Sequence, residues 1–221
     1  MHSRLPAHAM WDLTQPLNQD TPHFPGDPAF RREPIPGQDP WRISHIAMSS
    51  HNGTHLDAPL HRVEGGATID QLPLERLTGK ALVVSATGLP ANAPIPASVL
   101  DALSVPVWPG WIALIHTGWE RYWRDEHYFR HPYLSPELAH RLVDSGCKLV
   151  AIDALSVDST ADNGEAAHVI LLNRDVLIAE NLRGLGDLDP GRPCRVACLP
   201  LPMTGSDGSP VRFVAWEPGE I

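Results

Sequence analysis

The sequence predicts a mixed α/β fold, with a sheet and flanking helices in one domain. Short apolar runs recur along the chain, and near-continuous apolar character is typical of strands that are covered on both faces. A segment with recognisable helix ends separates two of these runs. Helices that alternate with strands indicate a layered α/β arrangement.

Four segments have the length and apolar character of buried strands: 80–85, 111–116, 148–153 and 195–199. Another apolar run at 176–179 leads directly into Glu180, so we expect Glu180 to face inward at a strand end. Around the last of the four segments, Cys194, Val196 and Cys198 alternate and would share one strand face. We expect these thiols to be buried and inert.

The clearest helix is expected at 135–145. Ser135 is a suitable N-cap, and Gly146 lies where a C-terminal cap belongs. An apolar stripe follows the helical period: Leu138, Leu142 and Val143. We expect a second helix at 96–103 and a third that begins near Glu165.

The chain has 221 residues, which suits a single domain over 1–221. Its 43% hydrophobic and 19% charged residues are typical of a globular protein rather than a disordered one.

A net charge of −9 without any Lys/Arg-rich run argues against nucleic acid and anionic membranes as partners. No apolar run approaches the roughly 20 residues of a membrane span. The cysteines form no Cys-x-x-Cys pair and residues 1–6 lack a signal-peptide core, so we expect a reduced, cytoplasmic protein.

The main functional signal is one short segment in which three histidines flank an aspartate. His51, His55, Asp57 and His61 all have odd numbers, so on an extended strand they would point to one face. Ten extended residues span about 33 Å, whereas the ligands of one metal lie within about 2.2 Å of it. The segment must therefore turn if these side chains meet, and Gly53 permits a sharp turn.

Imidazole and carboxylate ligands together suit Zn²⁺, Mn²⁺ or Fe²⁺. A zinc-protease helix is disfavoured because Pro59 interrupts it and because no glutamate follows His51. No cysteine lies nearby, which disfavours a closed structural zinc site. A carboxylate in such a cluster can bridge two metals about 3.5–4 Å apart. Serine hydrolase chemistry is the least favoured alternative, since the chain has no Gly-x-Ser-x-Gly elbow.

The pattern His-x-Gly-Thr-His-x-Asp-x-Pro-x-His, which begins at His51, resembles the signature of the cyclase family. This family includes the bacterial-type kynurenine formamidases and the isatin hydrolases. Other segments that resemble the family are Trp11-Asp12-Leu13-Thr14, Pro25-Gly26-Asp27, 151–158, His168 and Glu180-Asn181-Leu182. The chain departs from the pattern at His116 in place of Arg, at Phe24 in place of Trp, and at Ala167 where a histidine pair is frequent.

The resemblance implies the family's swivelling β/β/α fold and two divalent metals per subunit, Zn²⁺ first with Mn²⁺ or Fe²⁺ as alternatives. The metal ligands that it implies are His51, His55, Asp57, His168 and Glu180. Asp57 and Glu180 would bridge the two ions, and His61 would be the general acid/base. Dimers or higher homo-oligomers are implied as well.

The two distant ligands also make sense from the residues alone. Ligands from a single loop would leave a metal site open, and a later histidine and glutamate would close it. His168 lies in a predicted helical turn at 166–172. An inward-facing Glu180 would be costly to bury without a neighbouring cation, although an exposed glutamate is the alternative.

These observations predict a metal-dependent hydrolase that attacks an amide with metal-activated water. His61 would give the departing amine its proton, a task suited to imidazole. The favoured substrate is a small aryl amide, N-formylkynurenine, with Phe24 either stacked on its ring or packed in the core. Isatin-type lactam opening and other small-carbonyl cyclase reactions stay open. So does the alternative of a metal-binding protein without turnover.

Overall fold

The computed structural model describes residues 10–37, 39–107 and 109–217. The predicted cytoplasmic location stays a prediction, and residues 1–6 lie outside the described part of the chain. Among the described residues, no helix combines the length and apolar character that a membrane span requires.

The strands are β1 (Trp11–Asp12), β2 (Arg31–Pro34), β3 (Ser44–Ala47), β4 (His55–Asp57), β5 (Thr78–Ser85), β6 (Pro94–Ile95), β7 (Ile112–His116), β8 (Tyr133–Leu134), β9 (Leu149–Ile152), β10 (Leu177–Glu180), β11 (Cys194–Pro200) and β12 (Gly208–Trp216). The α-helices are α1 (Leu74–Leu77), α2 (Pro136–Asp144) and α3 (Ala166–Leu172). Short 3-10 helices join them, including η1 (Pro59–His61) and η3 (Ala97–Leu100).

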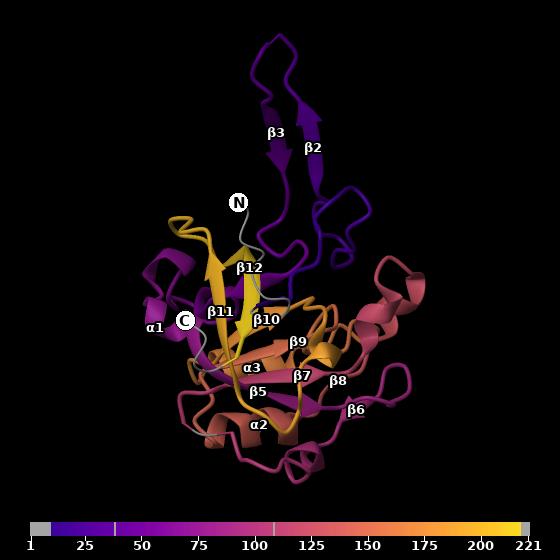
Figure 1. Cartoon of the computed structure of the whole chain (residues 1–221), viewed down its shortest axis with the longest axis vertical. Coiled ribbons are helices and arrows are strands. Elements are labelled where there is room, and N and C mark those ends of the chain that lie inside the picture. Colours follow the sequence, from indigo (N-terminus) through magenta and orange to yellow (C-terminus); the bar gives the residue numbers. More distant parts are fainter. Residues whose placement is uncertain (1–9, 38, 108, 218–221) are drawn as a thin grey trace, which may run out of the picture.

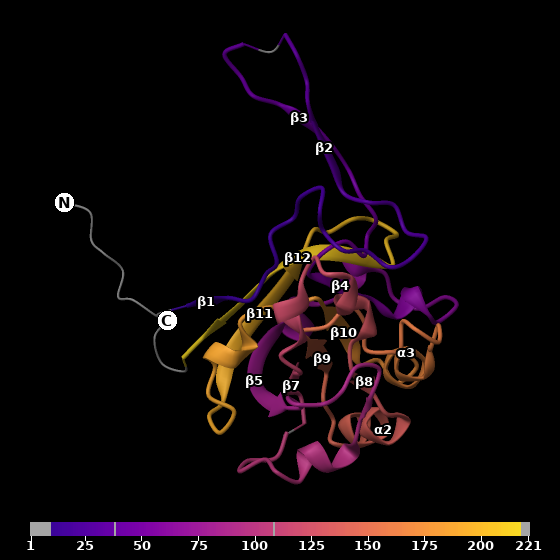
Figure 2. The same ribbon diagram turned by 90° about the vertical axis from the view of Figure 1, so that its right-hand side faces the viewer.

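One mixed sheet forms the body of the molecule and closes on itself (Figures 1 and 2). Its strand order is β1-β12-β11-β5-β7-β9-β10-β4, and β4 pairs both with β10 and with the start of β12. Strands β5, β7, β9 and β10 run parallel, whereas β4, β11 and β12 join through antiparallel pairs. The short strand β4 is therefore the seam of a barrel-like sheet.

Alternate side chains of the parallel strands enter two apolar cores. Along β5, Leu82 and Val84 pack in the core that α2 and α3 cover, whereas Ala81 and Val83 face the interior of the closed sheet. This two-sided burial explains the near-continuous apolar sequence of these strands. The face shared by the cysteines of β11 also points to the interior, and all three thiols of the chain are free and buried.

Most predicted elements are confirmed, including the strands and the mixed α/β architecture. Helix α2 begins after Ser135, whose Oγ accepts a hydrogen bond from the Leu138 N–H at 3.2 Å, as the N-cap prediction requires. The predicted helix at 96–103 is wrong, because only the single turn η3 forms there. None of its four residues is buried, so no packed face stabilises a longer helix.

Strands β2 and β3 form a separate hairpin that projects from the body (Figures 1 and 2). Its two strands pair only with each other in the described structure. Large apolar side chains are exposed along it: Ile35, Trp41, Ile43 and Ile46. The hairpin thus carries several large apolar side chains, among charged ones, that the fold of one chain leaves uncovered.

Candidate metal centre

Strand β4 positions two of the predicted metal ligands. Side chains alternate along a strand, so His55 and Asp57 share one face while Leu56 packs in the interior core. Both polar residues are buried, with 3% of His55 and 0% of Asp57 exposed. Hydrogen-bonded neighbours on both sides of β4 hold this face in place.

The neighbouring strands bring further acidic groups to the same place. Glu180 ends β10 and lies opposite His55 in the antiparallel register. On the other side, Gly208 begins β12 opposite Asp57, and Asp207 immediately precedes it. Register alone therefore places carboxylates from two distant segments beside β4.

The remaining histidines come from a turn and from two short helices. His51 lies in the turn before β4, where Gly53 has a φ of 63°. His61 ends η1, which begins with Pro59 directly after β4. His168 lies in α3. The segment therefore turns at both ends of β4, as the short span of a metal site requires.

In each of the two buried carboxylates, the two oxygens face different histidines. Asp57 Oδ1 lies 2.8 Å from His51 Nδ1 and 3.3 Å from His55 Nε2, whereas Asp57 Oδ2 lies 3.6 Å from His168 Nε2. Glu180 Oε2 lies 3.5 Å from His55 Nε2, and Glu180 Oε1 lies 3.6 Å from His168 Nε2. Each carboxylate thus turns one oxygen toward His55 and the other toward His168.

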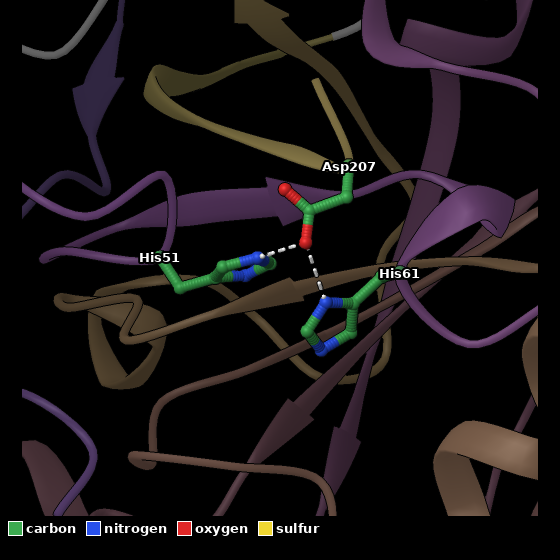
Figure 3. A group of neighbouring side chains, drawn as sticks. All are labelled: His51, His61 and Asp207. Atoms are coloured by element: carbon green, nitrogen blue, oxygen red, sulfur yellow. Dashed lines mark hydrogen bonds and ion pairs between the residues drawn. The ribbon is translucent and has the colours of Figure 1, made fainter. Parts of the chain in front are cut away.

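Each of these three histidines has its other ring nitrogen bound to an acceptor outside the cluster. His55 Nδ1 lies 2.8 Å from the Gly53 carbonyl oxygen. His168 Nδ1 lies 2.8 Å from Asp158 Oδ2, which also accepts a hydrogen bond from the His168 backbone N–H. His51 Nε2 lies 3.0 Å from Asp207 Oδ2 (Figure 3). An outer acceptor fixes which nitrogen of an imidazole turns inward as a ligand.

The charges of the cluster are strongly coupled. Burial raises the pKa of Glu180, and the neighbouring Asp57 carboxylate raises it further. Burial alone would raise the pKa of Asp57, but the surrounding histidines hold it well below its usual value. Burial lowers the pKa of His51, yet hydrogen bonds to Asp207 and Asp57 outweigh burial and raise it to about 10. The buried acids therefore depend on positive charge around them.

The residues fit a divalent metal. Asp57 Oδ2 is buried and has no hydrogen-bond partner among the described residues, and a buried carboxylate oxygen without a partner is costly. Nitrogen and oxygen ligand atoms of His51, His55 and Asp57 lie within 4.8 Å of one another. This donor set suits Zn²⁺, Mn²⁺ or Fe²⁺.

A cavity of about 500 Å³ opens above the cluster. All seven residues predicted for the site line it: Phe24, His51, His55, Asp57, His61, His168 and Glu180. Arg62 and Glu165 line it as well, with Arg62 Nη2 2.6 Å from Glu165 Oε2. Such a volume lies within the range of about 300–1,000 Å³ that is usual for small-molecule sites.

The sequence did not reveal the roles of Asp158 and Asp207. Asp158 is reached only through the resemblance of 151–158 to the family, and no sequence pattern points to Asp207. Asp207 stands 146 residues after His61, so no spacing connects the two. The one local signal was Gly208, whose missing side chain leaves room for the His51 ring.

Comparison with known proteins agrees with the family resemblance of the sequence. The model of the family described as "Putative cyclase" matches residues 11–159. The kynurenine formamidase of Paracidovorax citrulli (strain AAC00-1) is 34% identical over 95% of this chain and 97% of its own length. The kynurenine formamidase of Bordetella avium (strain 197N) is 31% identical over 95% of this chain and 99% of its own length.

This chain is also similar in structure to several solved proteins. A predicted metal-dependent hydrolase from Bacillus stearothermophilus has a TM-score of 0.79 and 30% identity, over 94% of this chain and 98% of that chain. An isatin hydrolase bound to thioisatinate has a TM-score of 0.85 and 20% identity, over 93% of this chain and 91% of that chain. The second likeness concerns the fold alone.

The substitution Gly208→Ala should weaken metal binding. A Cβ atom at this position would lie 2.5 Å from His51 Cε1 and would force the ring to move. We expect an affinity loss of about tenfold or more, measured by competition with a chromophoric chelator and by metal analysis. Gly191→Ala is the matched control, since its Cβ would meet nothing closer than 3.4 Å. Equal metal affinity for Gly208→Ala and wild type would contradict the placement of His51.

Proposed function

The chain belongs to the cyclase family, and we propose that it is a metal-dependent amide hydrolase that converts N-formylkynurenine to kynurenine and formate. The observation that carries this proposal is the cavity, whose lining joins a cluster of buried acids and histidines to the more exposed His61. The kynurenine formamidases to which the chain is similar support the substrate class.

We propose two metal ions per subunit, Zn²⁺ first, with Mn²⁺ or Fe²⁺ as alternatives. His51 and His55 would hold one ion, and His168 would hold the other. Asp57 and Glu180 would bridge them, which agrees with the way each carboxylate turns one oxygen to each group. Such ions lower the pKa of bound water to about 7 and polarise a carbonyl oxygen.

The chain's own residues would move the proton and orient the substrate. Hydrolysis forms a bond between a water oxygen and the formyl carbon, and it breaks the bond from that carbon to the aryl nitrogen. The departing nitrogen must gain a proton, and His61 would supply it as general acid. His61 lines the cavity and its side chain is 32% exposed, against 3% for His55, 13% for His51 and 14% for His168, and its ring centroid lies 5.6 Å from that of His168.

A metal-binding protein without turnover is less well supported. That alternative predicts a closed site without room for a substrate. Here the proposed ligands line an open cavity of about 500 Å³, and His61 lines it beside them. A catalytic site keeps such access.

The rim of the cavity favours N-formylkynurenine over isatin. Kynurenine carries an α-amino acid with one positive and one negative group, whereas isatin is a neutral lactam. Arg62 and Glu165 offer one charge of each sign at the rim, and their ion pair is 43% and 66% exposed. We propose that Arg62 receives the α-carboxylate and Glu165 the α-ammonium group, while Phe24 stacks on the aryl ring.

We propose further that the chain assembles as a homodimer through its projecting hairpin. A two-stranded hairpin alone is marginally stable in water, and Trp41 at 76% exposure is a large apolar side chain to leave in solvent. The hairpin of β2 and β3 would pack against a second copy of the chain. Higher homo-oligomers built from such dimers are the alternative.

Purified protein of measured metal content should hydrolyse N-formylkynurenine in preference to isatin, because only the former matches both rim charges. Parallel assays of the two substrates, with kynurenine and formate measured as products, provide the test. Removal of the metal with a chelator should abolish turnover, and added Zn²⁺ or Mn²⁺ should restore it. Turnover of isatin alone would contradict the proposed substrate, and turnover of neither would contradict the proposed hydrolysis of an aryl amide.

His61→Ala is the control variant for this assay. It should keep the metal complement of the wild type and lose at least about 100-fold in turnover, the usual contribution of general acid–base catalysis. Near-normal turnover with a full metal complement would remove His61 from the mechanism.

Arg62→Ala should separate recognition of the amino acid from the chemistry. The KM for N-formylkynurenine should rise about tenfold or more, as expected for a lost charged hydrogen bond. Turnover of formanilide, which lacks the amino acid, should stay within about twofold. Arg141→Ala is the matched control, because it breaks an exposed ion pair between Arg141 of α2 and Asp101. Equal losses on both substrates would contradict the rim assignment.

Trp41→Ser should weaken the dimer, because it removes the most exposed large apolar side chain of the hairpin. Sedimentation velocity at several protein concentrations should show a shift from dimer to monomer. Leu74→Ser, at a 65% exposed position in α1, should leave assembly unchanged. A monomeric wild type would contradict the dimer.

A further inference from the structure

Asp207 joins a proposed metal ligand to the proposed acid catalyst through one oxygen atom. Its Oδ2 lies 3.0 Å from His51 Nε2 and 3.0 Å from His61 Nδ1 (Figure 3). Its other oxygen, Oδ1, accepts a hydrogen bond from Ser50 Oγ at 3.1 Å. Both carboxylate oxygens of Asp207 are therefore engaged around the mouth of the cavity.

The backbone holds this carboxylate in position although its side chain is 39% exposed. The Ala58 N–H donates to the Asp207 carbonyl oxygen at 2.9 Å, and the next residue, Gly208, pairs with Asp57 across the seam of the sheet. The strand pairing that fixes Asp57 thus fixes Asp207 as well. A carboxylate held in this way can orient the groups that it contacts.

A carboxylate oxygen only accepts hydrogen bonds, so the nitrogen that faces it must carry the hydrogen. His61 then bears hydrogen on Nδ1 and turns Nε2 away from Asp207. His51 faces a carboxylate with each ring nitrogen, Asp207 with Nε2 and Asp57 with Nδ1, so Asp207 holds hydrogen on Nε2 while Nδ1 would exchange its hydrogen for a metal ion. The Asp207 carboxylate thus selects Nε2 as the ring nitrogen that His61 has free for chemistry.

We propose that Asp207 is a positioning residue that holds the His61 imidazole in the orientation and tautomer needed for proton transfer to the leaving amine. This proposal rests on the proposed function of the site. The competing interpretation is that Asp207 is itself a metal ligand with His51 and His61, since ligand atoms of these three residues also lie within 4.8 Å of one another.

The decisive measurement compares leaving groups at saturating metal. Formanilide has a poor leaving amine that needs a proton, whereas the amine of p-nitroformanilide leaves more readily. Asp207→Ala should lower kcat for formanilide by about 10- to 100-fold and lower it much less for p-nitroformanilide. Asp207→Asn should recover part of the loss, because its amide oxygen can still accept one N–H.

A double variant tests whether Asp207 acts through His61. His61→Ala/Asp207→Ala should be no slower than His61→Ala alone, because residues that act as a unit are not additive. Multiplicative losses, or equal losses on both formanilides, would overturn the proposal. Loss of bound metal at saturating concentration, in proportion to activity, would favour the ligand interpretation and overturn it too.

Asp70→Ala is the matched control. Asp70 accepts a hydrogen bond from Gly205 N at 3.1 Å, so this variant loosens the same loop without touching either histidine. Its leaving-group dependence should equal that of the wild type. A dependence like that of Asp207→Ala would assign the effect to loop disorder and overturn the proposal.

A readout without turnover separates this proposal from the proposed function. Long-range ¹H–¹⁵N spectra of the metal-free protein, at a pH where the imidazole is neutral, report which nitrogen of His61 carries hydrogen. The wild type should show hydrogen on Nδ1, and Asp207→Ala should shift it toward Nε2. An unchanged tautomer would overturn the proposal even if the enzyme is active, whereas an inactive wild type with the expected tautomers would overturn only the proposed function.

Discussion

The buried carboxylate of Asp57 is the constraint on which the rest of this structure depends. It is fully buried, and one of its oxygens has no hydrogen-bond partner among the described residues. An uncompensated buried charge is strongly destabilising, so the fold must surround it with positive charge. Three imidazoles lie around it, and a second buried acid, Glu180, makes further positive charge necessary. Ligands of this kind bind metal with free energy that also stabilises the fold.

The closure of the sheet meets this constraint. Strand β4 has only three residues, yet it is hydrogen-bonded to β10 on one side and to β12 on the other. Glu180 reaches the centre at the end of β10, Asp207 reaches the mouth of the cavity from the residue before β12, and turns at either end of β4 add His51 and His61. The seam of the barrel and the proposed metal site are therefore the same structure, so damage to one would damage the other.

The sequence predicted those parts of the site that lie close together along the chain or end an apolar run. The odd-numbered spacing of His51, His55 and Asp57, with Gly53 between them, required a turn that the structure contains. Glu180 was predicted at a strand end because apolar residues precede it. Cross-strand register placed Asp207 beside His61, and register between distant strands leaves no mark in local sequence. The closed sheet and the projecting hairpin are likewise products of pairing that periodicity does not encode.

The proposed roles separate the residues of the chemistry from those of substrate choice. Four of the five proposed ligands lie on β4, at the end of β10 or on α3, where packing holds them rigidly, and His51 lies in the turn before β4. The residues proposed to choose the substrate occupy the rim: Phe24 comes from a loop, Arg62 follows η1, and Glu165 precedes α3. Rim residues can change without moving the ligands. They line the same cavity but take no part in the buried hydrogen bonds that hold the ligands in place. On the proposed function, this division leaves the choice of substrate to a few exposed side chains, while the buried ligands supply the same chemistry on one fold.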